Sequence, residues 1–208
     1  MILYVFISCQ THLESHYERI SEMMQKHNYK DYIYVVGGVE EINYNEERRI
    51  LSLNCNDFYE GLPEKVLMCY QYLFSAEQFR GFKYFCKLDI DMVIKKLFTK
   101  DLLSDYCGKI NRKGKGNRSW HMGKCSQSKK GKRFNNTPYK GTFPDWSLGG
   151  YGYILSRKAL KILGTEINIR NAENEIFEDV FIGKLLENKI RAKDIKHLKQ
   201  YIISPDHK

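Results

Sequence analysis

The residues best suited to chemistry lie at 87–91, where Asp89 and Asp91 follow an apolar, aromatic run over 82–88. The run is typical of a buried strand, and residues two apart on a strand project to the same side. Asp89 and Asp91 should therefore converge and could hold a hard divalent cation, as enzymes do to bind a nucleotide diphosphate. The alternative is that the pair only caps a turn or faces solvent. Its position favours the metal site, because α/β folds bind ligands at the carboxyl edge of the sheet.

A glycine-rich turn flanked by aromatic residues forms the second candidate, at 145–156. Gly149 and Gly150 would let the backbone approach a ligand closely, and aromatic faces stack on bases or sugar rings. Trp146 and Tyr151 are therefore candidates to line a sugar and acceptor cleft, with core aromatics as the alternative. The turn lacks the lysine-and-hydroxyl ending of a P-loop and does not follow the first strand, as a dinucleotide fingerprint would.

The third candidate is the acidic pair Glu178 and Asp179, followed by Val180 and Gly183 at the start of an expected helix. Acids in a first helical turn often only interact with the helix dipole, so the pair by itself does not indicate a catalytic role.

The hydrophobic pattern predicts alternating strands and helices that could position these residues. Strands are expected at 2–8, 32–36, 49–53, 82–88 and 151–155, and helices at 13–27, 62–79, 157–163 and 179–188. This alternation predicts an α/β fold with a mostly parallel central sheet flanked by helices. We expect a single domain over 1–208, interrupted by a long loop at about 109–141 that has little periodicity.

The composition fits such a domain, since 208 residues with 42% hydrophobic content can bury a sizeable core. No apolar window is long enough for a membrane span, and the first residues do not resemble a signal peptide. We therefore expect a cytoplasmic location. The six cysteines include no C-x-x-C pair, which favours reduced thiols, although disulfide pairing is an alternative.

The net charge of +9 is concentrated in one segment, because 107–143 holds eleven Lys or Arg and no Asp or Glu. This segment predicts an anionic ligand such as nucleotide phosphates, an acidic glycan or nucleic acid. The alternative is a solvated, flexible loop.

Taken in order, the three candidates resemble motifs of the inverting glycosyltransferases of family 31, which include the β1,3-galactosyltransferases, core-1 galactosyltransferase and Fringe. Residues 87–91 resemble the strand and acidic triplet of that family, with Ile90 in place of the middle acid. Residues 149–156 resemble its Gly-Gly-Ala-Gly-Tyr strand entry, with Tyr151 in place of Ala, and 178–183 resemble its acidic pair followed by Val and Gly.

The amino end extends the resemblance, since Thr11, His16 and Arg19 repeat a Thr, His and Arg spacing of Fringe-like enzymes. Two departures stand out: 26–27 is Lys-His instead of Thr-Trp, and Gly37 and Gly38 replace an acid after the second strand. The membrane anchor and stem of Golgi members have no counterpart here, so we expect a minimal catalytic domain.

The resemblance implies a GT-A fold and a metal-dependent reaction. A hexose would move from UDP-galactose, UDP-glucose or UDP-GlcNAc to a hydroxyl of a glycan or glycoprotein, with inversion. For Mn²⁺ or Mg²⁺ it implies Asp91 as a direct ligand, Asp89 as a ligand or a contact to ribose or bound water, and His207 as a third ligand. His197 is the alternative to His207.

The resemblance also implies a catalytic base, Asp179, with Glu178 as the alternate. The donor-binding residues would be Thr11, Arg19, Lys87, Asp89, Gly149, Gly150, Trp146 and Tyr151. Arg19 could instead form a surface ion pair with Glu18 or Glu22. We expect the basic loop to be mobile without ligand and to close over the donor or an acidic acceptor.

Two other functions use the same residues differently. A nucleic-acid-binding module would explain the net charge and the basic loop with Trp120 and Phe134, but not the acids. A metal-dependent phosphotransferase or nuclease would use the acids on a phosphate ester. The resemblance favours glycosyl transfer, so we expect no nucleic-acid partner.

Overall fold

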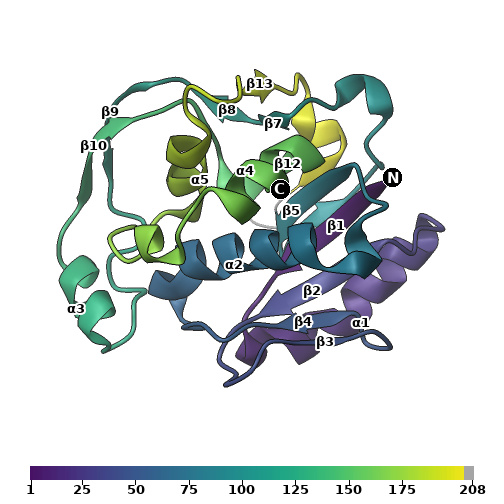
Figure 1. The fold of residues 1–208 in the computed structure, drawn as a ribbon, viewed down its shortest axis with the longest axis horizontal. Coiled ribbons are helices and arrows are strands. Elements are labelled where there is room, and N and C mark those ends of the chain that lie inside the picture. Colours follow the sequence, from purple (N-terminus) through teal and green to yellow (C-terminus); the bar gives the residue numbers. More distant parts are fainter. Residues whose placement is uncertain (204–208) are drawn as a thin grey trace.

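The structure, a computed structural model, describes residues 1–203 and is built on an eight-stranded sheet (Figure 1). In spatial order its strands are β13 (Lys193–Asp194), β7 (Tyr106–Gly108), β12 (Tyr153–Ser156), β5 (Tyr84–Asp89), β1 (Ile2–Ile7), β2 (Tyr32–Val36), β4 (Ile50–Ser52) and β3 (Asn43–Asn45). Strands β5, β1, β2 and β4 run parallel, β12 is antiparallel to β5 and β7, and β3 is antiparallel to β4. The prediction of an α/β fold with a mostly parallel sheet is confirmed.

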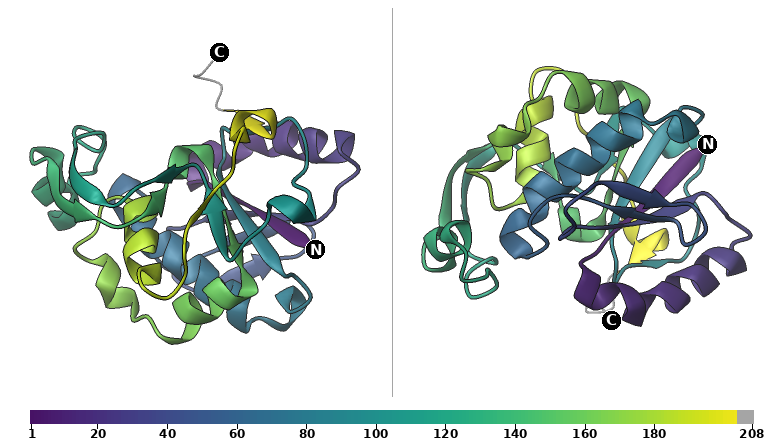
Figure 2. Two further views of the ribbon diagram at one scale, coloured as in Figure 1. Left: turned by 90° about the horizontal axis from the view of Figure 1, so that it is seen from above. Right: turned by 60° about the horizontal axis from the view of Figure 1, so that its bottom comes forward.

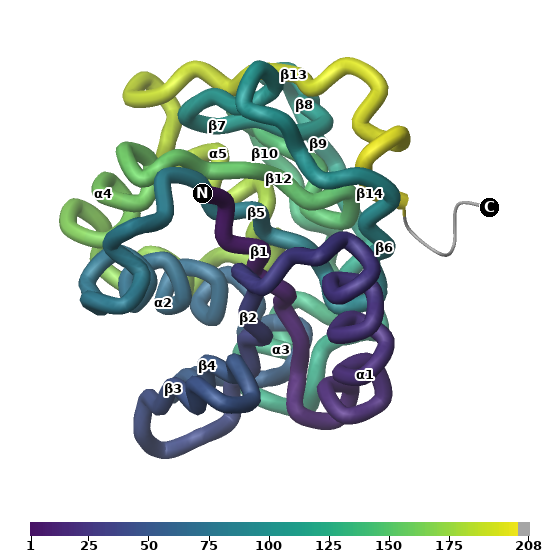
Figure 3. The backbone as a smooth tube through the Cα atoms, turned by 90° about the vertical axis from the view of Figure 1, so that its right-hand side faces the viewer, coloured from purple at the N-terminus to yellow at the C-terminus, as the bar shows by residue number. Residues whose placement is uncertain are grey.

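Helices cover both faces of the sheet, because alternate residues of β1 enter two separate cores. Leu3 and Val5 pack in the core beneath α2, α4 and α5, whereas Tyr4 and Phe6 pack beneath α1. Figure 3 shows α1 and α2 on opposite sides of β1 and β2. The helices are α1 (Gln10–Lys26), α2 (Leu62–Ser75), α3 (Lys129–Asn135), α4 (Arg157–Thr165) and α5 (Glu178–Leu186).

Short elements complete the fold. Three small ladders pair β9 (Gly114–Arg118) with β10 (Tyr139–Phe143), β8 (Ile110–Asn111) with β11 (Trp146–Ser147), and β6 (Val93–Ile94) with β14 (Ile202–Ile203). Turns of 3₁₀ helix lie at Tyr59–Gly61, Glu77–Phe79, Lys100–Leu102, Gly149–Tyr151, Ile169–Ala172 and Leu198–Gln200.

The strand expected at 151–155 begins two residues later, at Tyr153. Gly149–Tyr151 forms a 3₁₀ turn, and Gly152 follows with φ of +72°. A Cβ on Gly152 would lie 2.7 Å from the Lys87 carbonyl oxygen and 2.5 Å from Leu88 Cδ2. Glycine at 152 therefore permits both the left-handed turn and close contact with β5.

The basic segment at 109–141 contains β9, α3 and β10, which corrects the expectation of a long loop without regular structure. Figures 1 and 2 show these elements extending away from the central sheet. The β9 residues are exposed or half-buried, so no alternation of polar and apolar residues marks the strand in the sequence. Gly116 makes room for the Phe143 ring, which a Cβ would approach to 2.1 Å.

The structure also bears on the expected reduced state of the cysteines and on the expected lack of a membrane-spanning helix. All six cysteines are free thiols in the structure, five of them buried. Over residues 1–203, none of the helices combines the length and apolarity required to cross a bilayer.

Candidate functional site

Two cavities meet at the carboxyl ends of β1 and β5. The first, here called the β1 cavity, has a volume of about 800 Å³ and is lined by the ends of β1 and β5, the first residues of α1, and residues 55–65. The second, the α5 cavity, has a volume of about 490 Å³ and lies between the end of β5, the Gly149–Tyr151 turn and the start of α5. Asp89, Asp91, Tyr59 and Leu62 line both.

Asp89 and Asp91 border the same pair of cavities, but β5 ends at Asp89, so the turn after the strand, and not alternation along it, places Asp91. Asp89 ends β5, and the backbone that leads on to Asp91 is held by Arg19 of α1. The Arg19 guanidinium donates to the carbonyl oxygens of Ile90 at 2.5 Å and Met92 at 3.4 Å. Arg19 thus contacts the acidic turn, and its expected contact with a nucleotide stays a prediction.

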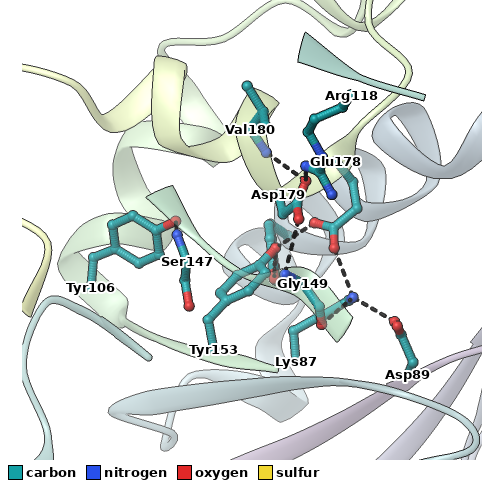
Figure 4. Close-up of polar contacts among 11 residues, drawn as sticks. Lys87, Asp89, Tyr106, Arg118, Ser147, Gly149, Tyr153, Glu178, Asp179 and Val180 are labelled. Carbon is teal, nitrogen blue, oxygen red and sulfur yellow. Dashed lines mark hydrogen bonds and ion pairs between the residues drawn. The ribbon is translucent and has the colours of Figure 1, made fainter. Parts of the chain in front are cut away.

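Lys87 lies beneath Asp89 with its side chain 1% exposed. Its ammonium is 2.5 Å from Asp89 Oδ1, 2.7 Å from Glu178 Oε1 and 3.4 Å from the Gly149 carbonyl oxygen (Figure 4). Burial alone lowers the pKa of Lys87, but the two carboxylates outweigh it and raise the pKa above its ordinary value. A permanent positive charge therefore joins two of the candidate motifs.

Glu178 is buried at the start of α5. Its Oε2 accepts a hydrogen bond from the Tyr153 hydroxyl at 3.0 Å, and Tyr70 donates to Tyr153 at 2.9 Å. Burial raises the pKa of Glu178 to about 6, against the opposing charge of Lys87, with Asp179 and Asp89 adding to the rise.

Asp179 is held by three donors. Its Oδ2 accepts from the Gly149 amide at 3.0 Å, and its Oδ1 accepts from the Val180 amide at 2.8 Å and from Arg118 Nη1 at 2.8 Å (Figure 4). A Cβ on Gly149 would lie 2.4 Å from Glu178 Oε1. Glycine at 149 therefore lets the turn close onto the acidic pair.

Arg118 is the last residue of β9 and reaches Asp179 from the basic segment. Its guanidinium carbon lies 3.8 Å from the centroid of the Phe177 ring and 4.5 Å from that of Trp146. Trp146 is itself buried, so it supports Arg118, in keeping with the core-aromatic alternative. Such stacking holds the guanidinium in place.

The other predicted residues are dispersed. Thr11 lines the β1 cavity, whereas Gly150 and Tyr151 line the α5 cavity. His207 lies outside the described residues. His197 is exposed and lines a separate cavity with Lys95 and Lys109.

Asp89 and Asp91 are the carboxylates available to Mn²⁺ or Mg²⁺ at the junction of the two cavities. Within residues 1–203 no group of three or more His, Cys, Asp or Glu side chains could hold a metal ion. Asp89 and Asp91 nevertheless supply hard carboxylate oxygens that border both cavities. Mg²⁺ is commonly held by one or two carboxylates together with substrate phosphates and water, so the pair fits such an ion.

Sequence reasoning missed a second polar network, in which Gln10, Asp57 and Lys65 line the β1 cavity. Asp57 Oδ1 accepts from the Gly37 amide at 2.6 Å and pairs with Lys65 at 2.5 Å, while its Oδ2 accepts from the Gln10 amide at 2.7 Å. One sequence feature could have indicated this network: Lys65 lies beside the apolar residues Val66 and Leu67 near the start of an expected helix. The role of Arg118 could not be predicted, because nothing in the sequence distinguishes it from the other ten Lys and Arg residues of 107–143.

The sequence profile described as Galactosyltransferase matches residues 16–197. No curated protein sequence matches the chain significantly.

Two solved structures cover most of the chain at low identity. One is described as a glucose-1-phosphate thymidylyltransferase from Bacillus anthracis in complex with sucrose (8% identity, 93% of this chain, 87% of that chain, TM-score 0.45). The other is a glycosyltransferase involved in glycosylation of the major capsid of PBCV-1 (14% identity, 92% of this chain, 80% of that chain, TM-score 0.42).

Proposed function

Because the chain belongs to the galactosyltransferase family and is thus a glycosyltransferase, we propose that it moves a hexose from a UDP-sugar to an acceptor hydroxyl with inversion. UDP-galactose, UDP-glucose and UDP-GlcNAc are the candidate donors, and a glycan or glycoprotein is the candidate acceptor. One observation carries the proposal: Asp89 and Asp91 border both the β1 cavity and the α5 cavity that holds Glu178 and Asp179.

The donor nucleotide is assigned to the β1 cavity and the hexose to the α5 cavity. Thr11 and Gly38 line the nucleotide side, and Asp89 and Asp91 would hold Mn²⁺ or Mg²⁺ at the junction. When bound, such an ion would neutralise charge on the departing diphosphate. Lys87 forms an ion pair with Asp89 at 2.5 Å and orients that carboxylate from below.

Asp179 is assigned as the base that removes the proton of the attacking hydroxyl. The hydroxyl oxygen forms the bond to the anomeric carbon as the bond to the diphosphate breaks, and the proton passes to Asp179. Gly149, Val180 and Arg118 orient this carboxylate from three directions. Glu178, whose oxygens accept from Lys87 and Tyr153, is the alternate base.

A panel of nucleotide sugars tests the enzyme class and the donor together. With Mn²⁺ present, we expect one UDP-sugar to be hydrolysed slowly without acceptor and to raise the melting temperature, and chelation to remove both effects. The proposal would be contradicted if no nucleotide sugar were hydrolysed or raised the melting temperature while the protein bound nucleic acid with a salt-dependent affinity.

The substitution Asp179→Asn tests the base. Since general bases contribute about 10²-fold to 10⁴-fold, we expect transfer to fall at least about 100-fold. The melting-temperature shift with UDP and Mn²⁺ should persist, because Asp179 does not line the β1 cavity. Near-native turnover in the Asn variant would show that the assignment is wrong.

A further inference from the structure

Trp120 is an exposed aromatic residue on a firmly anchored turn. Its side chain is 70% exposed, whereas His121 and Cys125 on the same turn are buried. Hydrogen bonds from Met122 N to Ser119 O at 2.9 Å and from Lys124 N to His121 O at 3.0 Å close the turn. The indole is therefore presented to solvent by a fixed backbone.

The indole borders the cavity that contains the candidate base. Trp120 lines the α5 cavity together with Arg118, Phe177 and Asp179, and it does not line the β1 cavity. An acceptor must reach Asp179 from the side opposite the diphosphate. The acceptor would therefore bind in the α5 cavity beside the donor hexose, and Trp120 lines that cavity.

Lys124 contacts Trp120 and also lines the β1 cavity, which is assigned to the donor nucleotide. Its ammonium lies 3.2 Å from the centroid of the Trp120 ring. The ammonium lies over one face of the indole, and because the side chain is 70% exposed, the opposite face is available to a ligand.

The charges of the α5 cavity indicate the kind of acceptor. Among the described residues that line it, four are acidic (Asp89, Asp91, Glu178 and Asp179). Two cations contact them, Arg118 at Asp179 and the buried Lys87 at Asp89 and Glu178, so the acids outnumber these cations. A carboxylated or phosphorylated sugar would be repelled there. A neutral sugar ring, by contrast, can place its C–H groups against an indole.

We propose that Trp120 is the platform on which a neutral saccharide acceptor stacks with its hydroxyl toward Asp179. The proposal rests on the proposed function, because it needs the base and the donor in the cavities assigned above. Under this proposal the acceptor is a neutral sugar, and not the acidic acceptor that we expected the basic segment to cover.

Fluorescence quenching tests binding without requiring activity. The chain has two tryptophans, and Trp146 is 5% exposed, so acrylamide should quench mainly Trp120. In the presence of UDP and Mn²⁺, we expect methyl β-galactoside or methyl β-N-acetylglucosaminide to reduce the quenching constant about twofold. Methyl β-glucuronide should not, and Trp120→Phe should remove the response. Protection by the glucuronide alone, or by no glycoside, would overturn the proposal.

Kinetics provide a second test with a matched control on the same turn. Trp120→Ala should raise the ratio of acceptor KM to donor KM about tenfold, and Trp120→Phe should recover most of the loss. Met122→Ala, also exposed but outside both cavities, should change the ratio less than twofold. Equal effects of the two Ala variants would refute a platform role.

The outcomes separate this inference from the proposed function. If no nucleotide sugar is hydrolysed, the proposed function fails, while quenching still reports whether Trp120 binds a saccharide. If hydrolysis occurs and Trp120→Ala leaves the KM ratio unchanged, only the platform fails.

Discussion

At the scale of single residues, the site depends on buried charges that compensate one another. Lys87 lies between Asp89 and Glu178, and Arg118 faces Asp179, so each acid of the α5 pair has its own cation. Lys87, Glu178 and Asp179 are buried, and leaving one of these three charges without its partner would cost several kcal/mol, about 3–5 in comparable pairs. The sign and placement of each charge are therefore tightly constrained.

Glu178 should make stability depend on pH in an identifiable way. Its pKa is raised to about 6, so between pH 4.5 and 6 the folded protein binds its proton more readily than the unfolded chain does. Ionised Glu178 is thus unfavourable above pH 6, and this cost disappears as the pH falls toward 4.5. Relative to Glu178→Gln, we expect the wild-type free energy of unfolding to increase by about 1 kcal/mol from pH 7 to pH 5.

Urea unfolding of both proteins at several pH values measures this difference. Comparison with the Gln variant cancels the titration of the other carboxylates. A stability difference that stays constant from pH 7 to pH 5 would show that Glu178 does not titrate in this range.

Arg118 should act as a positioning residue for Asp179. Arg118→Ala removes one of three donors to Asp179, and we expect kcat to fall about tenfold to 100-fold with little change in the donor KM. Arg118→Lys should recover part of the loss, because it keeps the charge but not the stacking on Phe177 and Trp146. An effect confined to the donor KM would instead place Arg118 in nucleotide binding.

At the scale of elements, the basic segment is anchored to the start of α2 by one carboxylate. Buried Glu60 accepts hydrogen bonds from Ser126 N at 3.1 Å, Ser128 Oγ at 2.7 Å and the Ser126 hydroxyl. Burial raises its pKa, but these bonds prevail and lower it to about 2. The stabilisation is therefore present above pH 4.5 and is lost as the pH falls toward 2.

Glu60→Gln should loosen this anchor. The substitution removes charge-assisted hydrogen bonds, so we expect a loss of about 1–3 kcal/mol at pH 7 and faster proteolysis within 109–141. UDP with Mn²⁺ should slow the cleavage in the wild type if the segment closes over the donor. Glu77→Gln, which alters an exposed ion pair with Arg80, serves as the control and should change stability by less than about 1 kcal/mol.

Unchanged cleavage in Glu60→Gln would show that other contacts hold the segment. Equal cleavage of the wild type with and without UDP and Mn²⁺ would count against closure over the donor.

At the scale of the whole molecule, the topology brings together motifs that lie far apart in the chain. Strand β12 pairs antiparallel with β5, so Tyr153 lies opposite Lys87 and the Gly149–Tyr151 turn lies at the end of β5. The match over 16–197 confirms the family resemblance drawn from these motifs, and with it the glycosyltransferase activity. The alternatives of a nucleic-acid-binding module and of a phosphotransferase or nuclease are set aside accordingly.

The sequence by itself determined the order of the main elements (β1, α1, β2, β4, α2, β5, β12, α4 and α5), the acidic pair at the end of β5, the glycine turn and the acids that open α5. Each of these is a local pattern, because burial repeats every second residue in a strand and about every 3.6 residues in a helix. Only the tertiary structure decided that Arg118 meets Asp179 across 61 positions and that Lys87 joins Asp89 to Glu178. Pairings between distant segments depend on how the elements pack, and the exposed β9 and β10 carry no periodic pattern that would reveal them.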